Sequence, residues 1–174
     1  KPLVDWDHFS YRSLNVKMMY NTDSLVEEYA RFYPPATTLF QYFFMKVIGV
    51  YKQGIEAFAM QLLGFSLLIP MFNNVKNNKF VKFTTVAIIL CIPAVFKNVV
   101  FYESAYPDAT IGLLLGYILY TYFIEDYSKY KILSIGIAIS VLILTKPLGI
   151  AIALIAICIM LIYEFFKNKY ILKE

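Results

Sequence analysis

Residues 148–166, LGIAIALIAICIMLIYEFF, form an apolar run of 19 residues, close to the roughly 20 that cross a bilayer as one helix. Hydrophobic residues make up 60% of the 174-residue chain and charged residues 16%, and the mean hydropathy is +0.62. A soluble domain is usually about 45–50% apolar and about 25% charged. A chain of this length has no core large enough to hide so much apolar surface from water, so we expect lipid to be the solvent.

Four further apolar runs precede this one, with short polar or basic connectors between them. They predict an all-α fold, a polytopic membrane helical bundle of about five spans within residues 55–174. Residues 1–54 are predicted to form an external loop with interfacial, juxtamembrane helices. The chain begins at Lys1 and no signal peptide opens it, so we expect a fragment of a longer protein. The predicted spans are 55–73, 83–97, 108–124, 131–146 and 148–166.

The lysines between the runs indicate which way the spans face. With five spans, eight lysines fall on one side of the membrane and two, Lys97 and Lys146, on the other. The positive-inside rule then places the lysine-rich side in the cytoplasm and the N-terminal polar segment outside. The net charge of +4 forms no basic stripe, so we expect membrane lipids and no nucleic acid as partners. The eight lysines are Lys76, Lys79, Lys82, Lys129, Lys131, Lys167, Lys169 and Lys173.

Residues 36–51, ATTLFQYFFMKVIGVY, follow a Pro-Pro pair, which is favoured at the start of a helix. This run is shorter than the roughly 20 apolar residues of a span, and two polar side chains interrupt it. Two interpretations stay open: a short span, which would put residues 1–34 in the cytoplasm, or a helix along the membrane surface. The length of the run and its aromatic residues favour the surface helix.

Residues 5–35, DWDHFSYRSLNVKMMYNTDSLVEEYARFYPP, form the one long polar segment. An acidic residue beside a membrane surface can act as a general base towards a hydroxyl group. Asp7, with Asp5 beside it, is therefore a candidate catalytic residue. The simpler interpretation is a solvated loop in which Asp7 or Ser10 caps a helix.

Basic side chains of the same segment are candidates for binding a phosphate. Arg12 offers a bidentate fork and Lys17 a point charge, although both could instead pair with acidic side chains or lipid headgroups. His8 titrates near neutral pH and is a further candidate for substrate binding. It is the only histidine, and both cysteines lie in apolar runs, so the sequence predicts no cofactor and no metal site from spacing, while leaving a divalent metal open.

A second polar cluster, YESAYPD at 102–108, lies between two predicted spans on the same side as the N-terminal segment. Ionisable groups at the edge of an apolar run are costly to bury and are often functional. Glu103 and Asp108 are therefore candidate catalytic residues and Tyr106 a candidate for substrate binding. Asp108 could equally cap the following helix. Lys146 in LTKPLG could contact a lipid phosphate or extend to the membrane interface.

Four glycines in the predicted spans, at positions 112, 116, 136 and 149, are interpreted as points of close helix packing. Gly112 and Gly116 have the small-xxx-small spacing that lets membrane helices approach closely. We assign none of the four a chemical role.

Several short motifs follow one another in a fixed order along the chain. The motifs are WDHFSY at 6–11, Lys17-Met18, YPP at 33–35 followed by LFQYFF, YPD at 106–108 before GLLLGY, and TKPLG at 145–149. They resemble motifs of bacterial polytopic membrane proteins of the GT-C glycosyltransferase superfamily, which are distantly similar to protein mannosyltransferases and the lipid A aminoarabinose transferase. The resemblance covers nearly the whole chain.

The resemblance implies a cell-envelope enzyme that takes a sugar from a polyprenyl-phosphate carrier. It would pass the sugar to an acceptor at the outer face of the bacterial plasma membrane. Asp7 matches the acidic position of the family and would be the general base, and Tyr33 in the YPP motif is a candidate for substrate binding. The chain departs from the family at His8, where relatives have Glu, and at Tyr11-Arg12, where they have His-Trp.

The alternative function is that of a non-enzymatic membrane transporter or flippase for a lipid-linked or small anionic substrate. Such a protein would place ionisable groups along a pathway through its spans. The charges of this chain cluster at the ends of the apolar runs and few lie within them, which favours the transferase.

Overall fold

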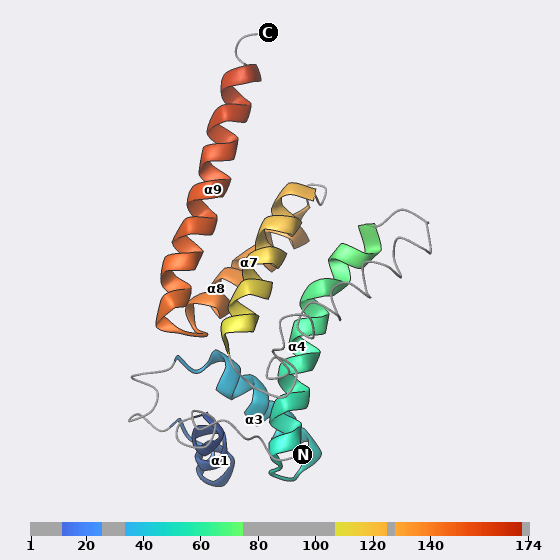
Figure 1. The fold of residues 1–174 in the computed structure, drawn as a ribbon, viewed down its shortest axis with the longest axis vertical. Coiled ribbons are helices and arrows are strands. Elements are labelled where there is room, and N and C mark those ends of the chain that lie inside the picture. The colour runs from blue at the N-terminus through green and yellow to red at the C-terminus, as the bar shows by residue number, and fades with distance from the viewer. Residues whose placement is uncertain (1–11, 26–33, 75–106, 125–127, 172–174) are drawn as a thin grey trace, which may run out of the picture.

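The computed structural model describes residues 12–25, 34–74, 107–124 and 128–171. These residues form six helices and no strand, so the all-α prediction is confirmed for this part of the chain (Figure 1). The predicted span at 83–97 lies outside the described residues, as do the candidates Asp5, Asp7, His8, Tyr33, Glu103 and Tyr106. The helices are α1 (Ser13–Thr22), α3 (Ala36–Ile48), α4 (Gln53–Asn74), α7 (Pro107–Ile124), α8 (Lys129–Ile143) and α9 (Pro147–Ile171).

Three of these helices are long and apolar enough to cross a membrane. Only 17% of the α9 segment is buried within the protein, so most of its leucine and isoleucine side chains point outward. Such a continuous apolar surface needs an apolar solvent, which agrees with the high apolar content of the sequence. α8 has 15 residues and a length of about 22 Å, less than the roughly 30 Å of a hydrocarbon core. The three segments are Gln53–Pro70, Pro107–Ile124 and Pro147–Lys167.

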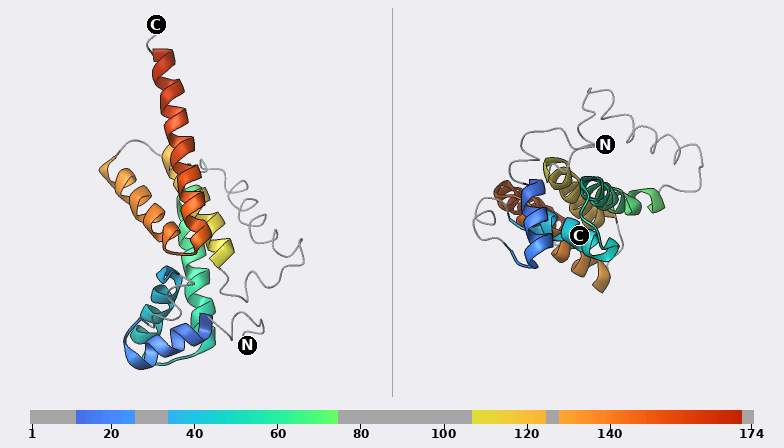
Figure 2. Two further views of the ribbon diagram at one scale, coloured as in Figure 1. Left: turned by 90° about the vertical axis from the view of Figure 1, so that its left-hand side faces the viewer. Right: turned by 90° about the horizontal axis from the view of Figure 1, so that it is seen from below.

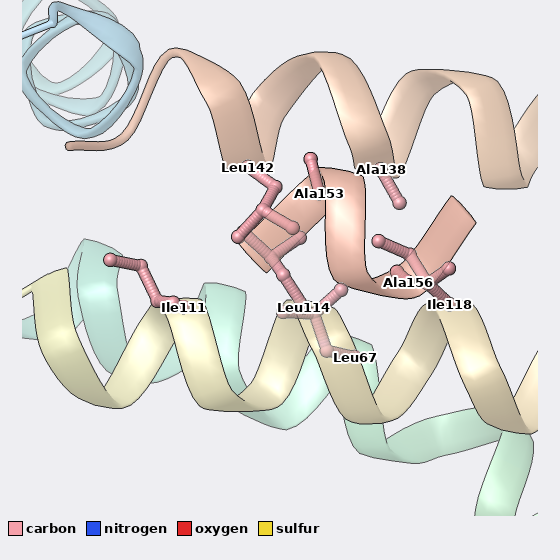
Figure 3. Close-up of a cluster of buried hydrophobic side chains, with 8 residues drawn as sticks. All are labelled: Leu67, Ile111, Leu114, Ile118, Ala138, Leu142, Ala153 and Ala156. Carbon is pink, nitrogen blue, oxygen red and sulfur yellow. The ribbon is translucent and has the colours of Figure 1, made fainter. Parts of the chain in front are cut away.

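α7 lies at the centre of the helix packing and contacts α4, α8 and α9. Figures 1 and 2 show α4, α7 and α9 rising from the end of the molecule near α1 and α3, with α8 running the opposite way. α9 extends beyond the other helices (Figure 2). The core contains three alanines, whose small side chains let the helices approach closely. Its residues are Leu67, Ile111, Leu114, Ile118, Ala138, Leu142, Ala153 and Ala156 (Figure 3).

The sequence between α8 and α9 explains how the chain reverses in so few residues. The Thr145 hydroxyl donates to the Val141 carbonyl at 2.6 Å, and the Thr145 amide donates to the Leu142 carbonyl at 3.2 Å. Pro147 is then the first residue of α9, a position where its missing N–H costs no hydrogen bond. A Cβ atom added to Gly149 would lie 2.0 Å from the Leu142 carbonyl oxygen, so only glycine fits at this crossing.

α3 exposes large apolar side chains and buries two polar ones. Val47 is 68% exposed, and Phe43 and Leu39, one and two turns earlier on the same face, are also exposed. Thr38 and Gln41 are instead buried, beside the fully buried Met45. A helix surrounded by water would have the opposite arrangement. α3 packs between α1 and the first half of α4, at the end where α7 and α9 begin (Figure 1).

Candidate functional site

The start of α3 and the turn between α8 and α9 meet at one point. The Ala36 amide donates a hydrogen bond of 2.9 Å to the carbonyl of Leu144. From the same turn, Lys146 Nζ contacts Asp108 Oδ1 at 2.6 Å, and Asp108 is in the first turn of α7. Asp108 of YPD therefore contacts Lys146 of TKPLG, and Ala36 and Leu144, which directly adjoin YPP and TKPLG, are bonded to each other although far apart in sequence.

Two of the predicted site residues, Asp108 and Lys146, are each other's partners. Their side chains are 55% and 29% exposed, respectively. An ion pair with this much access to water contributes about 0.2–1 kcal/mol to stability. The pair is therefore easy to open, and a phosphate could replace the Asp108 carboxylate beside Lys146 at little cost.

The other two predicted site residues in the described chain lie at α1. Arg12 is the residue before the helix, and Lys17 is an exposed residue within it. Lys17 Nζ lies 5.9 Å from the centroid of the Tyr51 ring, within the range of a cation–π contact. Lys17 therefore lies at the turn between α3 and α4, and its described ring contact is not with the Asp108–Lys146 pair.

Sequence reasoning missed a buried polar network between α1 and α4. Glu56 is fully buried, and its Oε1 accepts a hydrogen bond of 2.8 Å from the Ser13 hydroxyl. The Tyr51 hydroxyl lies 2.7 Å from Ser13 Oγ. Because the one hydroxyl proton of Ser13 goes to Glu56, Tyr51 is the donor in that second bond. The chain of bonds runs from Tyr51 through Ser13 to Glu56.

The other carboxylate oxygen of Glu56, Oε2, has no hydrogen-bond partner among the described residues. An ionised carboxylate without access to water loses several kcal/mol of solvation. One charge-assisted hydrogen bond returns about 1.5–3 kcal/mol, and a position in the first turn of a helix about 0.3–1 kcal/mol. These contributions offset only part of the loss, so Glu56 needs a further source of neutralisation. The sequence feature that could have revealed this residue is that Glu56 is a lone carboxylate just inside an apolar run.

A second polar network joins α1 to α3 on the surface. Lys46 forms an ion pair with Asp23, and the Tyr42 hydroxyl donates to the same carboxylate at 2.7 Å. The hydrogen bonds from Lys46 and then Tyr42 lower the pKa of Asp23, and the bond to Asp23 raises the pKa of Lys46. Lys46 Nζ also lies 4.8 Å from the ring centroid of Tyr20. This network links the end of α1 to α3 at an exposed position.

At the opposite end of the bundle, aromatic side chains gather where α7 and α8 meet α9. The Tyr122 hydroxyl donates to Glu164 at 2.7 Å, and Lys131 Nζ donates to the Tyr122 carbonyl at 2.7 Å. The rings of Tyr122, Phe123 and Tyr163 pack edge to face. Aromatic rings beside lysines are typical of the boundary between lipid and water.

No group of three or more His, Cys, Asp or Glu side chains that could hold a metal ion occurs in the described ranges. Comparisons with protein-family models, with curated proteins and with solved structures give no match for this chain. The resemblance to the GT-C superfamily therefore stays an expectation based on the sequence motifs.

Proposed function

We propose that the chain is part of a multi-pass membrane glycosyltransferase. It transfers a sugar from a polyprenyl-phosphate-linked donor to an acceptor at the outer face of a bacterial plasma membrane. The observation that supports this best is the meeting of three motif segments at one end of the bundle, where Ala36 bonds to Leu144 and Lys146 to Asp108. A lipid-linked substrate needs polar groups collected at one edge of an apolar bundle.

The proposed reaction needs a base for the acceptor and positive charge for the donor. Asp7 takes the proton of the acceptor hydroxyl while the hydroxyl oxygen bonds to the anomeric carbon. The bond from that carbon to the phosphate oxygen breaks, and the polyprenyl phosphate leaves with the electron pair. Lys146 contacts the phosphate, and Arg12 and Lys17, at α1, attract it at longer range. The carboxylates proposed to assist are Asp5, Glu103 and Asp108.

We assign α3 to the membrane surface as a juxtamembrane helix. Its exposed apolar face, which includes Leu39, Phe43 and Val47, would enter the lipid beside the start of α4. Its buried polar residues would then face α1 and α4 instead of lipid. This placement gives a lipid-linked donor a path along the bilayer surface to the motif segments.

The proposed orientation puts the Asp108–Lys146 end outside. In the described chain the opposite end holds Lys129, Lys131 and Lys167, next to the aromatic rings at the ends of α7 and α9. Counted over the connectors of the long helices, these three lysines outnumber Lys146 in the α8–α9 turn, and we propose the cytoplasm for this end. The other end also carries Arg12, Lys17, Lys46 and Lys52, on and beside α1 and α3, which lie outside those connectors in this proposal. Cysteines introduced at Ser10 and Ser104 should then both react with an impermeant reagent added outside intact cells. Reaction at only one of them would contradict a shared outer site.

The direct test is transfer of a labelled sugar from a polyprenyl-phosphate donor by the full-length protein. Asp7→Asn should lower the transfer rate by about 100-fold or more, because the acceptor loses its base. Asp23→Asn is the matched control, since it also removes one carboxylate near the N-terminus but outside the proposed machinery. Full transfer by the Asp7 variant would remove Asp7 from the mechanism.

The alternative, a transporter or flippase for a lipid-linked or small anionic substrate, has one observation in its favour. Glu56 is fully buried within a segment long and apolar enough to cross a membrane, where ionisable groups often mark a pathway. Vesicles containing the protein separate the two functions. Movement of a labelled lipid-linked sugar across the bilayer without transfer to an acceptor would favour the transporter.

A further inference from the structure

Two buried acceptor atoms on adjoining helices lack donors in the described part of the chain. They are Glu56 Oε2 on α4 and Asn15 Oδ1 on α1. The two helices are joined directly by the Ser13–Glu56 hydrogen bond, and Ser13 is two residues before Asn15. Buried acceptors without donors are unusual in folded proteins, and a small ligand or an ordered water is the common explanation.

The ligand that Glu56 requires must bring positive charge. Its described hydrogen-bond partner, Ser13, is neutral, and the two ion pairs within the described ranges use Asp23 and Asp108 instead. A neutral water would satisfy an oxygen atom but would leave the carboxylate charge unbalanced. We infer that the Glu56 carboxylate is an exchange site for one small monovalent cation, a proton or Na⁺, bound between α1 and α4.

The donor atoms favour a hard cation, and the charge of the site favours a monovalent one. Carboxylate, carboxamide and hydroxyl oxygens are the ligands that hard cations prefer. The Glu56 side chain supplies a single formal negative charge, which one proton or one Na⁺ balances completely. A divalent ion would leave an excess positive charge in a buried place.

The elements that pack around α1 and the start of α4 carry further charged and titratable groups. On α1 these are Arg12 and Lys17, and on α3 Lys46, which is paired with Asp23. In the turn before α4 they are Tyr51 and Lys52. The basic members of this set weaken cation binding when they approach, so occupancy reports on how closely α1 is docked.

The site has a consequence for α1. Ser13 is the first residue of α1, so its bond to Glu56 fixes where this helix begins beside α4. A bound cation stabilises the carboxylate in this geometry, and loss of the cation favours release of α1. The inference does not depend on sugar transfer, because it rests on Glu56 and its neighbours alone.

Thermal unfolding of the purified chain in detergent tests the inference. Na⁺ is varied against choline at constant ionic strength and pH 8, and pH is then varied from 8 to 5 without Na⁺. A ligand bound only by the folded chain raises the melting temperature as its concentration rises. If sodium is the occupant, we expect the melting temperature of wild type to rise with Na⁺. If a proton is the occupant, we expect it to rise on acidification alone. In either case Glu56→Gln should lose this rise in melting temperature. Bound ²²Na⁺ should fall by about tenfold or more in the variant if sodium is the occupant.

Asp23→Asn is the matched control, because it removes an exposed carboxylate of the same region and should keep the wild-type response. If Glu56→Gln does not fold, infrared spectroscopy of wild type follows the carbonyl band of a protonated buried carboxyl, which Na⁺ should diminish if the two cations exchange. The inference is overturned if wild type shows neither ²²Na⁺ binding nor a protonated carboxyl band. It is also overturned if the Glu56 variant responds to both cations as wild type does.

Discussion

The amide of Ala36 and the carbonyl of Leu144 form a hydrogen bond of 2.9 Å that connects two helix ends. Ala36 begins α3, and Leu144 follows the last residue of α8. A first amide and a last carbonyl have no partner within their own helices, so each group satisfies the other. This bond places the Pro-Pro segment beside the TKPLG turn. The candidate site therefore depends on the conformation of that turn.

Gly149→Ala should destabilise the protein, because the new methyl group would lie 2.0 Å from the Leu142 carbonyl oxygen. Backbone cannot move away as a flexible side chain can, so we expect a loss of about 1–3 kcal/mol. The measurement is the melting temperature in detergent. Gly136→Ala is the control, since a Cβ there meets nothing within 4 Å and should change stability little or raise it. An equal loss in both variants would contradict a specific close contact at Gly149.

The apolar segments could be predicted from the sequence because each is bounded by a local signal. The runs predicted at 108–124 and 148–166 lie within α7 and α9, which both begin at a proline. Proline at the first helical position and a continuous apolar run are properties of neighbouring residues, so no tertiary information is needed.

Contacts between distant residues could not be predicted in the same way. Asp108 and Lys146 were both candidates, yet their pairing depends on how α7 and α9 lie together. The glycines show the same limit: Gly112 was expected at a close contact and meets none within 4 Å, whereas Gly149 meets backbone. The importance of Glu56 depends on α1 covering it, which a scan for apolar runs does not reveal.

Tyr51 should make stability depend on pH in the alkaline range. Burial raises the pKa of Tyr51 to about 12 from its ordinary value of 10, and this effect exceeds the opposite effect of the hydrogen bond with Ser13. The unfolded chain therefore loses this proton first. The contribution of Tyr51 to stability is fully present below pH 10 and is lost as pH rises towards 12.

The measurement is the free energy of unfolding of wild type and Tyr51→Phe between pH 8 and 12. The difference between the two proteins should shrink above pH 10, because Phe has no proton to lose. Tyr130→Phe, at a side chain that is 83% exposed, should follow the wild-type curve. A difference that stays constant over the whole range would show that the Tyr51 phenol is not shielded from water.

Val47 should lie in lipid if α3 rests on the membrane surface. The chain has one tryptophan, Trp6, so Val47→Trp in a Trp6→Phe background gives a single fluorescent probe. Brominated lipids should quench this probe strongly, and its emission should move to the blue. Asn21→Trp in the same background is the control, since position 21 is exposed at the end of α1 and carries a polar residue. Equal quenching at both positions would contradict a lipid-facing side of α3.

The energy of the Asp108–Lys146 pair tests whether this end of the bundle is open to water. A double-mutant cycle with Asp108→Asn, Lys146→Met and the double variant isolates the coupling from the effect of each residue on its own helix. With half-exposed side chains we expect a coupling of about 0.2–1 kcal/mol that decreases as salt is raised to about 1 M. A coupling of about 3 kcal/mol or more, insensitive to salt, would mean that lipid or another part of the chain covers the pair. A phosphate could then not displace the Asp108 carboxylate at little cost, and Lys146 would no longer be a suitable residue for binding the donor.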